Sequence, residues 1–295
     1  MSNQIKVLTR ADLDGLVCAV FLKNTENIQE VRFSEPKFVQ DGEIEIDSND
    51  ILANLPYDKR CGMWFDHHIA NVKPKEFKGA FKNAPSAARV IYDYYLPDFP
   101  VLARYEELLH HTDKIDSANL TYAEVIEPSG YLILSMTIDG KYHEDKPYWL
   151  HLIDLMMEKT IDEIMADAEV KKRVDSFKES NLQFMEAVRD NSKVEKNVLI
   201  TDLRKFDELP NGNRYYLYAF QAATNISLKL TNDRERPGFV SIGVGYNIFN
   251  KTANINVGEL MKKYGGGGHK AVGSTRVKKD DADRVVQEML KYLVQ

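Results

Sequence analysis

An apolar run that stops abruptly in metal-competent side chains is the feature that most constrains this chain. The apolar residues 63–65 are followed directly by Asp66, His67 and His68. A buried strand that ends in polar side chains places them at the carboxyl edge of a sheet, where open α/β sheets bind their ligands. A carboxylate beside imidazoles suits Mn²⁺, Zn²⁺ or Fe²⁺ better than an ion such as Ca²⁺, which prefers oxygen ligands alone. The alternative interpretation is a helix start with Asp66 as its N-cap residue.

A pair of carboxylates follows the first predicted strand. Residues 4–8 form a short apolar strand, and Asp12 and Asp14 come just after it, with Gly15 allowing a tight turn before a helix predicted over 16–23. Two carboxylates this close repel each other, and one pKa rises, unless a cation lies between them. Capping of the helix by one of the two is the alternative, and both interpretations stay open.

A third polar cluster lies at residues 110–118, after a helix predicted over 101–110. It mixes imidazoles with carboxylates, and either Asp113 or Asp116 would close a metal site built by the first two clusters. The two aspartates are three residues apart, so both can face one side of a helical turn. An ordinary solvated helix end explains the cluster equally well.

Four consecutive glycines, residues 265–268, are followed by His269 and Lys270. Such a run carries a large conformational entropy cost, so we expect it where the backbone needs a positive φ or approaches something closely. Bare N–H groups in that arrangement bind anions. A flexible linker is excluded because a strand and a final helix over 281–294 follow at once. The run fits neither the phosphate-binding P-loop nor the dinucleotide fingerprint.

The order of the predicted elements indicates an α/β chain of two domains. In the front part, strands alternate with helices, which implies a mostly parallel sheet flanked by helices. One such helix is predicted over 85–96, where Ser86 can cap it and Pro97 ends it. Residues 43–46 alternate charged and apolar side chains, as an edge strand does. The predicted divisions are a front domain over 1–147, a helical connector over 148–193, and a smaller C-terminal α/β domain over 194–295.

The elements of the rear part are predicted from shorter patterns. Residues 191–193 are the expected linker. Strands are predicted over 197–201, 215–219 and 239–246, with a helix over 222–230 between the second and the third and another helix over 257–264 before the glycines.

The amino-acid composition argues against several classes of function. The 295 residues carry a net charge of −6, which argues against a globally basic nucleic-acid binder. The two cysteines, Cys18 and Cys61, lie in apolar segments and do not indicate a disulfide framework, so we expect a cytoplasmic protein. We find no signal peptide pattern. No apolar run reaches the roughly 20 residues needed to cross a bilayer, so no membrane association is expected.

Three motifs taken together resemble the DHH phosphoesterase superfamily with its C-terminal DHHA1 domain. They are Asp12-Leu13-Asp14-Gly15, Asp66-His67-His68 and the glycine run with His269. The resemblance covers nearly the whole chain. The superfamily includes oligoribonucleases, pAp phosphatases, cyclic-dinucleotide phosphodiesterases, RecJ exonucleases and exopolyphosphatase-like proteins.

The resemblance implies a site and its partners. The front domain would bind one or two divalent cations, most often Mn²⁺, with Mg²⁺, Co²⁺ and Fe²⁺ as alternatives. The implied metal ligands are Asp12, Asp14, Asp66, His67 and Asp113, with Asp116 as the alternative to Asp113. His68 would orient or contact phosphate, and the substrate's phosphate end would lie against Gly266, Gly267, Gly268 and His269. The implied ligand is a phosphorylated small molecule or a short oligonucleotide, and the implied assembly is a homodimer.

Three positions depart from the pattern of this superfamily, and one of them is Asn250, which stands where the DHHA1 domain often has an arginine upstream of the glycines. Arg10 stands where a histidine usually precedes the first aspartate, and Asn54 ends a predicted strand that usually ends in aspartate. A guanidinium is always charged and cannot ligate a cation, but it can bind phosphate through two hydrogen bonds. One of two metal positions is therefore expected to be weakened or absent, and Arg10 joins Asp12 and His68 as a predicted catalytic residue.

Two functions follow from these expectations. The first is a metal-dependent phosphoesterase that hydrolyses a phosphate ester or phosphoanhydride of a short nucleotide, a pAp-like molecule or polyphosphate. The second is a nucleotide-binding regulatory protein with a degenerate metal site.

Overall fold

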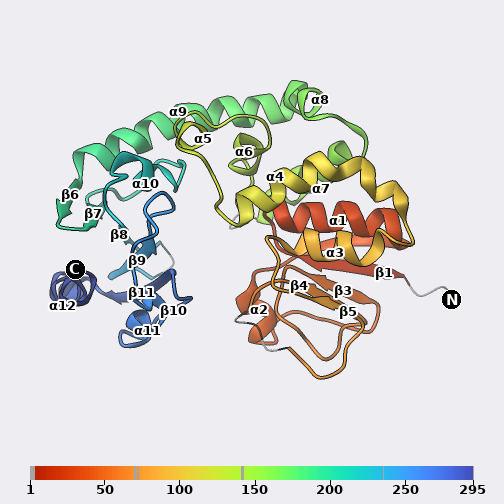
Figure 1. The fold of residues 1–295 in the computed structure, drawn as a ribbon, viewed down its shortest axis with the longest axis horizontal. Coiled ribbons are helices and arrows are strands. Elements are labelled where there is room, and N and C mark those ends of the chain that lie inside the picture. The colour runs from red at the N-terminus through yellow and green to blue at the C-terminus, as the bar shows by residue number, and fades with distance from the viewer. Residues whose placement is uncertain (1–3, 70, 72, 141–142, 235, 295) are drawn as a thin grey trace. The chain divides into compact units, whose positions relative to one another are not determined.

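The computed structural model describes residues 4–69, 71, 73–140, 143–234 and 236–294, and the chain divides into two compact units (Figure 1). The first unit comprises Met1–Asn119 and Ser129–Val174, and the second comprises Leu120–Pro128 and Asp175–Gln295. The boundary near residue 174 falls inside one long helix, α9 (Ala168–Asp190), within the segment for which the sequence predicts a separate connector.

The first unit is built on a five-stranded sheet in the order β2-β1-β3-β4-β5. All neighbouring strands are parallel, which confirms the predicted front sheet. The strands are β1 (Ile5–Thr9), β2 (Ile28–Phe33), β3 (Asp50–Ala53), β4 (Met63–Asp66) and β5 (Gly79–Phe81). In this order the chain first moves outward to β2 and then returns to β3 on the other side of β1. The carboxyl ends of β1 and β3 therefore flank a topological switch point, where open α/β sheets bind their ligands.

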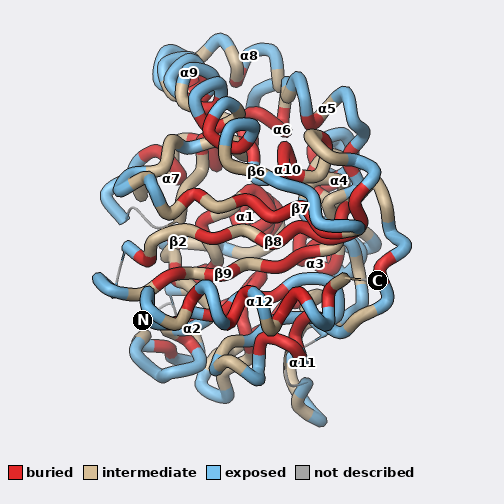
Figure 2. Tube along the Cα trace, turned by 90° about the vertical axis from the view of Figure 1, so that its left-hand side faces the viewer, coloured by how far each residue is buried: buried red, intermediate tan, exposed pale blue. Residues whose placement is uncertain are grey.

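Helix α1 (Leu13–Thr25) is the central helix of this unit. It is buried from Leu13 to Leu22, because α3, α4 and α7 pack around it. Figure 2 colours the chain by burial. It begins three residues earlier than predicted, since the side chain of Asp12 accepts a hydrogen bond from the Gly15 N–H and caps it. The other helices are α2 (Pro36–Gln40), α3 (Ala87–Tyr95), α4 (Glu106–Asp116), α6 (Gly130–Ser135), α7 (Lys146–Glu158) and α8 (Ile161–Ala166), with 3₁₀ turns η1 (Pro100–Tyr105) and η2 (His143–Asp145).

Residues 43–46 form a loop, so the edge strand predicted there is wrong. Their alternation has another cause. Ile46 is buried and Ile44 is partly buried in an apolar cluster with Leu8 and Trp64 on the sheet. The polar residues between them face solvent, which reproduces a strand pattern without strand pairing.

The second unit holds a six-stranded sheet in the order β10-β11-β9-β8-β7-β6, in which only β7 and β8 run parallel. Its strands are β6 (Ser192–Glu195), β7 (Val198–Asp202), β8 (Ile226–Asn232), β9 (Phe239–Tyr246), β10 (Gly267–Gly268) and β11 (Val272–Lys278). Its helices are α5 (Tyr122–Ile126), α10 (Tyr216–Phe220), α11 (Val257–Lys262) and α12 (Ala282–Leu293), with the turn η3 (Lys279–Asp281).

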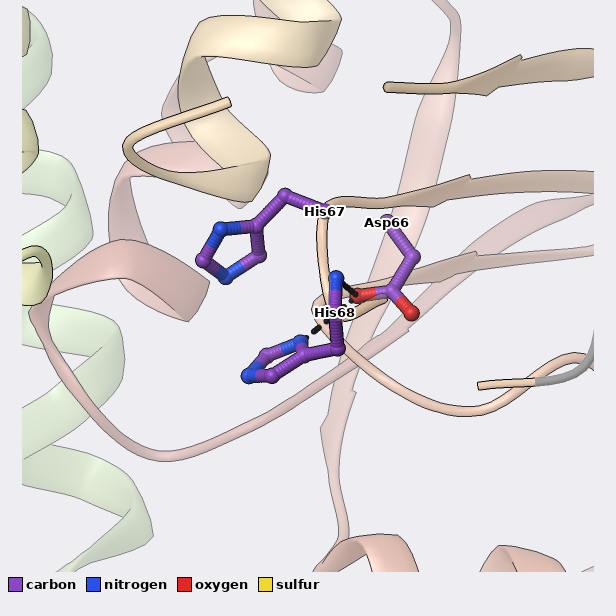
Figure 3. Close-up of side chains that lie close together, drawn as sticks. All are labelled: Asp66, His67 and His68. Atoms are coloured by element: carbon purple, nitrogen blue, oxygen red, sulfur yellow. Dashed lines mark hydrogen bonds and ion pairs between the residues drawn. The ribbon is translucent and has the colours of Figure 1, made fainter. Parts of the chain in front are cut away.

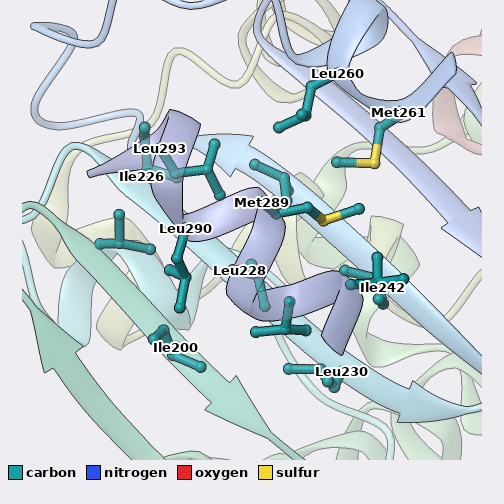
Figure 4. Packing of buried hydrophobic residues seen from close by; sticks show 14 of the residues in the cluster. Ile200, Ile226, Leu228, Leu230, Ile242, Leu260, Met261, Met289, Leu290 and Leu293 are labelled. Carbon is teal, nitrogen blue, oxygen red and sulfur yellow. The ribbon is translucent and has the colours of Figure 1, made fainter. Parts of the chain in front are cut away.

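Apolar side chains cover both faces of the central part of this second sheet. On one face, residues of β7, β8 and β9 pack against α11 and α12 (Figure 4). On the other face, Leu199 of β7 packs with α10 and with Phe184 and Val188 of α9. The alternation of Val198 and Ile200 with Leu199 between the two faces is the period of two expected for a strand.

Three predictions for this unit are wrong. The strand predicted over 215–219 is α10, and the helix predicted over 222–230 contains β8 instead. Asn213 starts the turn into α10, because its side chain accepts a hydrogen bond from the Tyr215 N–H. The linker predicted over 191–193 overlaps β6. In the part of the chain that the structure describes, no helix has the length and apolar character to span a bilayer.

Candidate metal centre

The polar residues singled out in the first unit gather at the carboxyl ends of three adjacent strands. Arg10 and Asp12 follow β1, Asn54 follows β3 directly, and Asp66 is the last residue of β4, with His67 after it. This is the edge where the strand order reverses. The arrangement brings side chains more than 50 residues apart in sequence into one polar cluster.

Asp14, His67 and Asp116 form a group whose ligand atoms all lie within 4.8 Å of one another. The Nε2 atom of His67 is 3.8 Å from Oδ2 of Asp14 and 3.3 Å from Oδ2 of Asp116. Two carboxylates and one imidazole are a donor set suited to Mn²⁺, Fe²⁺ or Zn²⁺.

The ring of His67 is held in the form that a metal ligand requires. Its Nδ1 lies 3.0 Å from the carbonyl oxygen of Ala84, and because a carbonyl only accepts, Nδ1 carries the proton of the neutral ring. Nε2 then presents its lone pair to the two carboxylates, and this buried atom has no hydrogen-bond partner among the residues that the structure describes. A buried acceptor that faces two carboxylates fits a cation, and a carbonyl partner on the other ring nitrogen is the usual support for such a ligand.

The acidity of the two carboxyl groups reflects the same crowding. Burial, and then the charge of Asp12, raise the pKa of Asp14 to about 7. Burial, and then the charges of Asp14 and Asp12, raise the pKa of Asp116 to about 7. A divalent cation between these carboxylates would remove the repulsion and favour their ionised forms.

Asp14 is held in place by the start of α3. Its two carboxylate oxygens accept hydrogen bonds of 2.9 and 2.8 Å from the backbone N–H groups of Ala87 and Ala88. Ser86 caps this helix as predicted, accepting a hydrogen bond from the Arg89 N–H. The N-terminus of a helix favours a negative charge at this position.

Asp66, His67 and His68 lie together at the end of β4 (Figure 3), and Asp66 is fully buried. One oxygen of Asp66 lies 2.8 Å from Nδ1 of His68, and the other accepts a hydrogen bond from the side chain of Asn71. Burial alone would lower the pKa of His68, but the hydrogen bond and the charge of Asp66 outweigh it and raise that pKa. Asn71 is a contact that the sequence did not suggest, since a single asparagine in a loop carries no recognisable signal.

The structure places the two candidates for the late ligand in different surroundings. Asp113 does not join the group, because its carboxylate accepts hydrogen bonds from the Ser86 hydroxyl (2.6 Å) and from the guanidinium of Arg89 (2.9 and 2.6 Å). Asp116, the alternative left open by the sequence, is the residue that faces His67. Asp113 is thus a supporting residue for the start of α3.

Asp12, Arg10 and Asn54 form a separate part of the cluster. One oxygen of Asp12 accepts hydrogen bonds from the Gly15 N–H (2.9 Å) and from the Asn54 side chain (3.0 Å). The other oxygen lies 3.4 Å from Nη1 of Arg10. Arg10 also lies 3.5 Å from Glu35, measured from Nε to Oε2.

The glycine run lies in the second unit, in the turn between α11 and β11. Gly265 has a φ of +74° and Gly268 a φ of +148°. A Cβ at Gly266 would lie 2.1 Å from the carbonyl oxygen of Ser274. The N–H groups of Gly265 and Gly266 donate to backbone carbonyls of α11. These glycines therefore have structural reasons to be glycine, and the predicted binding role of Gly266, Gly267, Gly268 and the exposed His269 stays a prediction.

Comparisons with known proteins identify similar structures. No family model matches the chain, and no curated protein matches it in sequence. A solved pGpG-specific phosphodiesterase, PggH from Vibrio cholerae, is 35% identical, with a TM-score of 0.83 over 98% of this chain and 99% of that one. RecJ from Thermus thermophilus in complex with Mn²⁺ is 11% identical, with a TM-score of 0.61 over 98% of this chain and 52% of RecJ. The chain spans about half of RecJ, and this second likeness concerns the fold alone.

Proposed function

The chain belongs to the DHH phosphoesterase superfamily, and from this premise we propose that it is a metal-dependent hydrolase of a short linear dinucleotide such as pGpG. The substrate class rests on the 35% identity to a pGpG-specific phosphodiesterase over nearly the full length of both chains. Among the substrates considered from the sequence, this favours a short nucleotide over polyphosphate.

The observation that carries the proposal is the unpaired Nε2 atom of His67. It is buried, it faces the carboxylates of Asp14 and Asp116, and its tautomer is fixed by the carbonyl of Ala84. A divalent cation at this group would neutralise phosphoryl oxygens and lower the pKa of a water molecule. The cation is proposed from the donor set, which also accepts ions other than Mn²⁺.

The surrounding residues would support the reaction in different ways. The helix start at Ala87 and Ala88 keeps Asp14 in one orientation. His68, whose pKa burial would lower but the hydrogen bond and charge of Asp66 raise, can donate to a phosphoryl oxygen when its imidazole is protonated. Asp66 orients this imidazole through the 2.8 Å contact with Nδ1.

The proposal is tested by turnover with a panel of substrates. Purified protein is incubated with Mn²⁺ and with pGpG, pAp, a cyclic dinucleotide or polyphosphate, and the products are separated by chromatography. We expect pGpG to be cleaved to GMP with the highest kcat/KM. Asp116→Asn should lower kcat/KM by more than about 100-fold, beyond the loss typical of supporting residues, while Asp98→Asn, at an exposed position, should leave it unchanged.

A second function is favoured by one observation. Asp12 is paired with Arg10 and Asn54, so part of the site lacks the ligands for a cation. A nucleotide-binding regulatory protein would bind pGpG in calorimetry without hydrolysing it. Hydrolysis of any substrate in the panel would rule out the regulatory function. The absence of hydrolysis with Mn²⁺, Mg²⁺, Co²⁺ and Fe²⁺ would rule out the hydrolase.

A further inference from the structure

We infer that the site holds one divalent cation, and that Arg10 supplies a second, permanent positive charge that binds a phosphoryl group of the substrate. This inference rests on the proposed function and deepens it. The polar cluster has two parts besides the group of Asp66, His67 and His68, whose ligand atoms also lie within 4.8 Å of one another and whose carboxylate contacts His68 and Asn71. One part, Asp14, His67 and Asp116, contains a buried acceptor without a partner. In the other part, Asp12, Asn54 and Arg10, the only carboxylate is already engaged.

The engagement of Asp12 leaves little room for a second cation. Its Oδ1 accepts from the N–H of Gly15, which caps α1, and from Nδ2 of Asn54. Its Oδ2 faces the guanidinium of Arg10 at 3.4 Å. A cation at Oδ2 of Asp12 would lie beside the permanent positive charge of Arg10, which opposes its binding.

Asn54 is a neutral residue in an unusual position. Its backbone φ is +56°, and its side chain is buried. Because Nδ2 donates to Asp12, the other amide atom is the acceptor Oδ1, and no residue in the described part of the chain donates a hydrogen bond to it. An amide oxygen next to an arginine suits a hydrogen-bond donor, such as a water molecule or a substrate hydroxyl, better than a divalent cation.

Arg10 has the properties of an anion-binding residue. Its side chain is 41% exposed, and two carboxylates lie close to it, Asp12 at Nη1 and Glu35 at Nε. These separations of 3.4 and 3.5 Å are ion pairs longer than the usual charge-assisted hydrogen bond, so the N–H groups keep donor capacity for another acceptor. A planar guanidinium matches the oxygens of a phosphoryl group in pairs.

The two parts of the cluster have different roles in binding the phosphoryl group. Asp14, His67 and Asp116 would hold the cation, which would neutralise phosphoryl oxygens, and Arg10 would add a permanent positive charge that binds the same phosphoryl group. The fixed charge of Arg10 repels a second divalent cation, and it remains in place when the metal concentration falls.

Metal counting tests the first half of this inference. Mn²⁺ is titrated into metal-free protein by calorimetry, and the bound ion is examined by electron paramagnetic resonance. We expect one Mn²⁺ per chain with the spectrum of an isolated ion. The double variant R10H/N54D should bind two Mn²⁺ per chain and show spin coupling between them.

Matched variants test the second half. R10K keeps the charge but loses the planar fork, so it should still bind one Mn²⁺, while its KM for the cleaved dinucleotide should rise about 10-fold. Two spin-coupled ions in the wild-type protein would overturn the inference, as would an unchanged count of one in R10H/N54D or an unchanged KM in R10K. A wild-type protein that binds no Mn²⁺ at all would overturn the proposed function, and that result differs from a count of two.

Discussion

Asp113 and Asp116 lie three residues apart on α4, yet their carboxylates have different partners. Asp113 contacts Ser86 and Arg89, and Asp116 lies beside His67. The sequence could predict that one of them joins the site, because both fall on one side of a helical turn. It could not choose between them, since the choice depends on how α4 is rotated against α1 and α3, and that rotation is set by packing between elements far apart in the sequence.

Substitution of the two aspartates separates a ligand from a supporting residue. Asp116→Asn should weaken Mn²⁺ binding by more than about 100-fold, whereas Asp113→Asn should weaken it by about 10-fold, because it only loosens the support of α3. Calorimetry on both variants measures this. Equal losses, or a larger loss for Asp113→Asn, would return Asp113 to the ligand set.

The raised pKa values of Asp14 and Asp116 predict a pH-dependent stability of the metal-free protein. Both groups have a pKa of about 7 in the folded state against 3.8 as the ordinary value, so the folded state retains protons that the unfolded state releases. Their contribution to the free energy of unfolding is therefore present below about pH 4 and is lost as the pH rises through about 7.

Denaturation in the presence of a chelator checks this sign. Asp116→Asn removes one titrating group, so its stability relative to wild type should increase between about pH 5 and about pH 8. With saturating Mn²⁺, the stability of Asp116→Asn relative to wild type should instead decrease as the pH rises, because Mn²⁺ stabilises the wild-type protein at high pH. If the free energies of unfolding of wild type and Asp116→Asn differed by the same amount at about pH 5 and about pH 8 in chelator, the raised pKa of Asp116 would be contradicted.

At the scale of elements, the N-terminus of α3 links the fold to the site. Ser86 caps this helix, and the next two N–H groups bind Asp14. The capping signal was readable in the sequence, because Ser86 stands just before an apolar helical pattern and Pro97 stands just after that pattern. The contact with Asp14 was not readable, since it joins residues 73 positions apart.

Removal of this cap should affect both stability and metal binding. Ser86→Ala should lower the free energy of unfolding by about 1 kcal/mol and also weaken Mn²⁺ binding, because Asp14 loses its fixed orientation. Thr160→Ala removes the cap of α8 and is the matched control. It should cost a similar amount of stability and leave metal affinity unchanged, and an equal loss of affinity in both variants would refute the special role of α3.

The glycine turn gives a second prediction at this scale. A Cβ at Gly268 would lie 2.3 Å from the carbonyl oxygen of Val272, and its φ is +148°, while a Cβ at Gly267 meets nothing within 4 Å. Gly268→Ala should therefore lower the free energy of unfolding by about 1–3 kcal/mol, and Gly267→Ala should change it by less than about 0.5 kcal/mol. Chemical denaturation measures both, and equal effects would contradict the turn geometry.

At the scale of the whole molecule, the sequence predicted the class of fold better than its details. Alternating strands and helices indicated the parallel sheet, and the polar residues after β1 and β4 indicated the edge that carries the site. The segment 215–230 was predicted with helix and strand exchanged, because short apolar runs have no distinctive period until their pairing is known. The supporting contacts of His67 with Ala84 and of Asp66 with Asn71 depend on loop conformation, which local patterns do not encode.

The position of a bound metal tests the central claim most directly. Crystals grown with Mn²⁺ are measured at the manganese absorption edge, and an anomalous difference map locates the ion. We expect a single strong peak within coordination distance of Asp14, His67 and Asp116. A peak at Asp113, or a map without any peak near these three residues, would contradict the account.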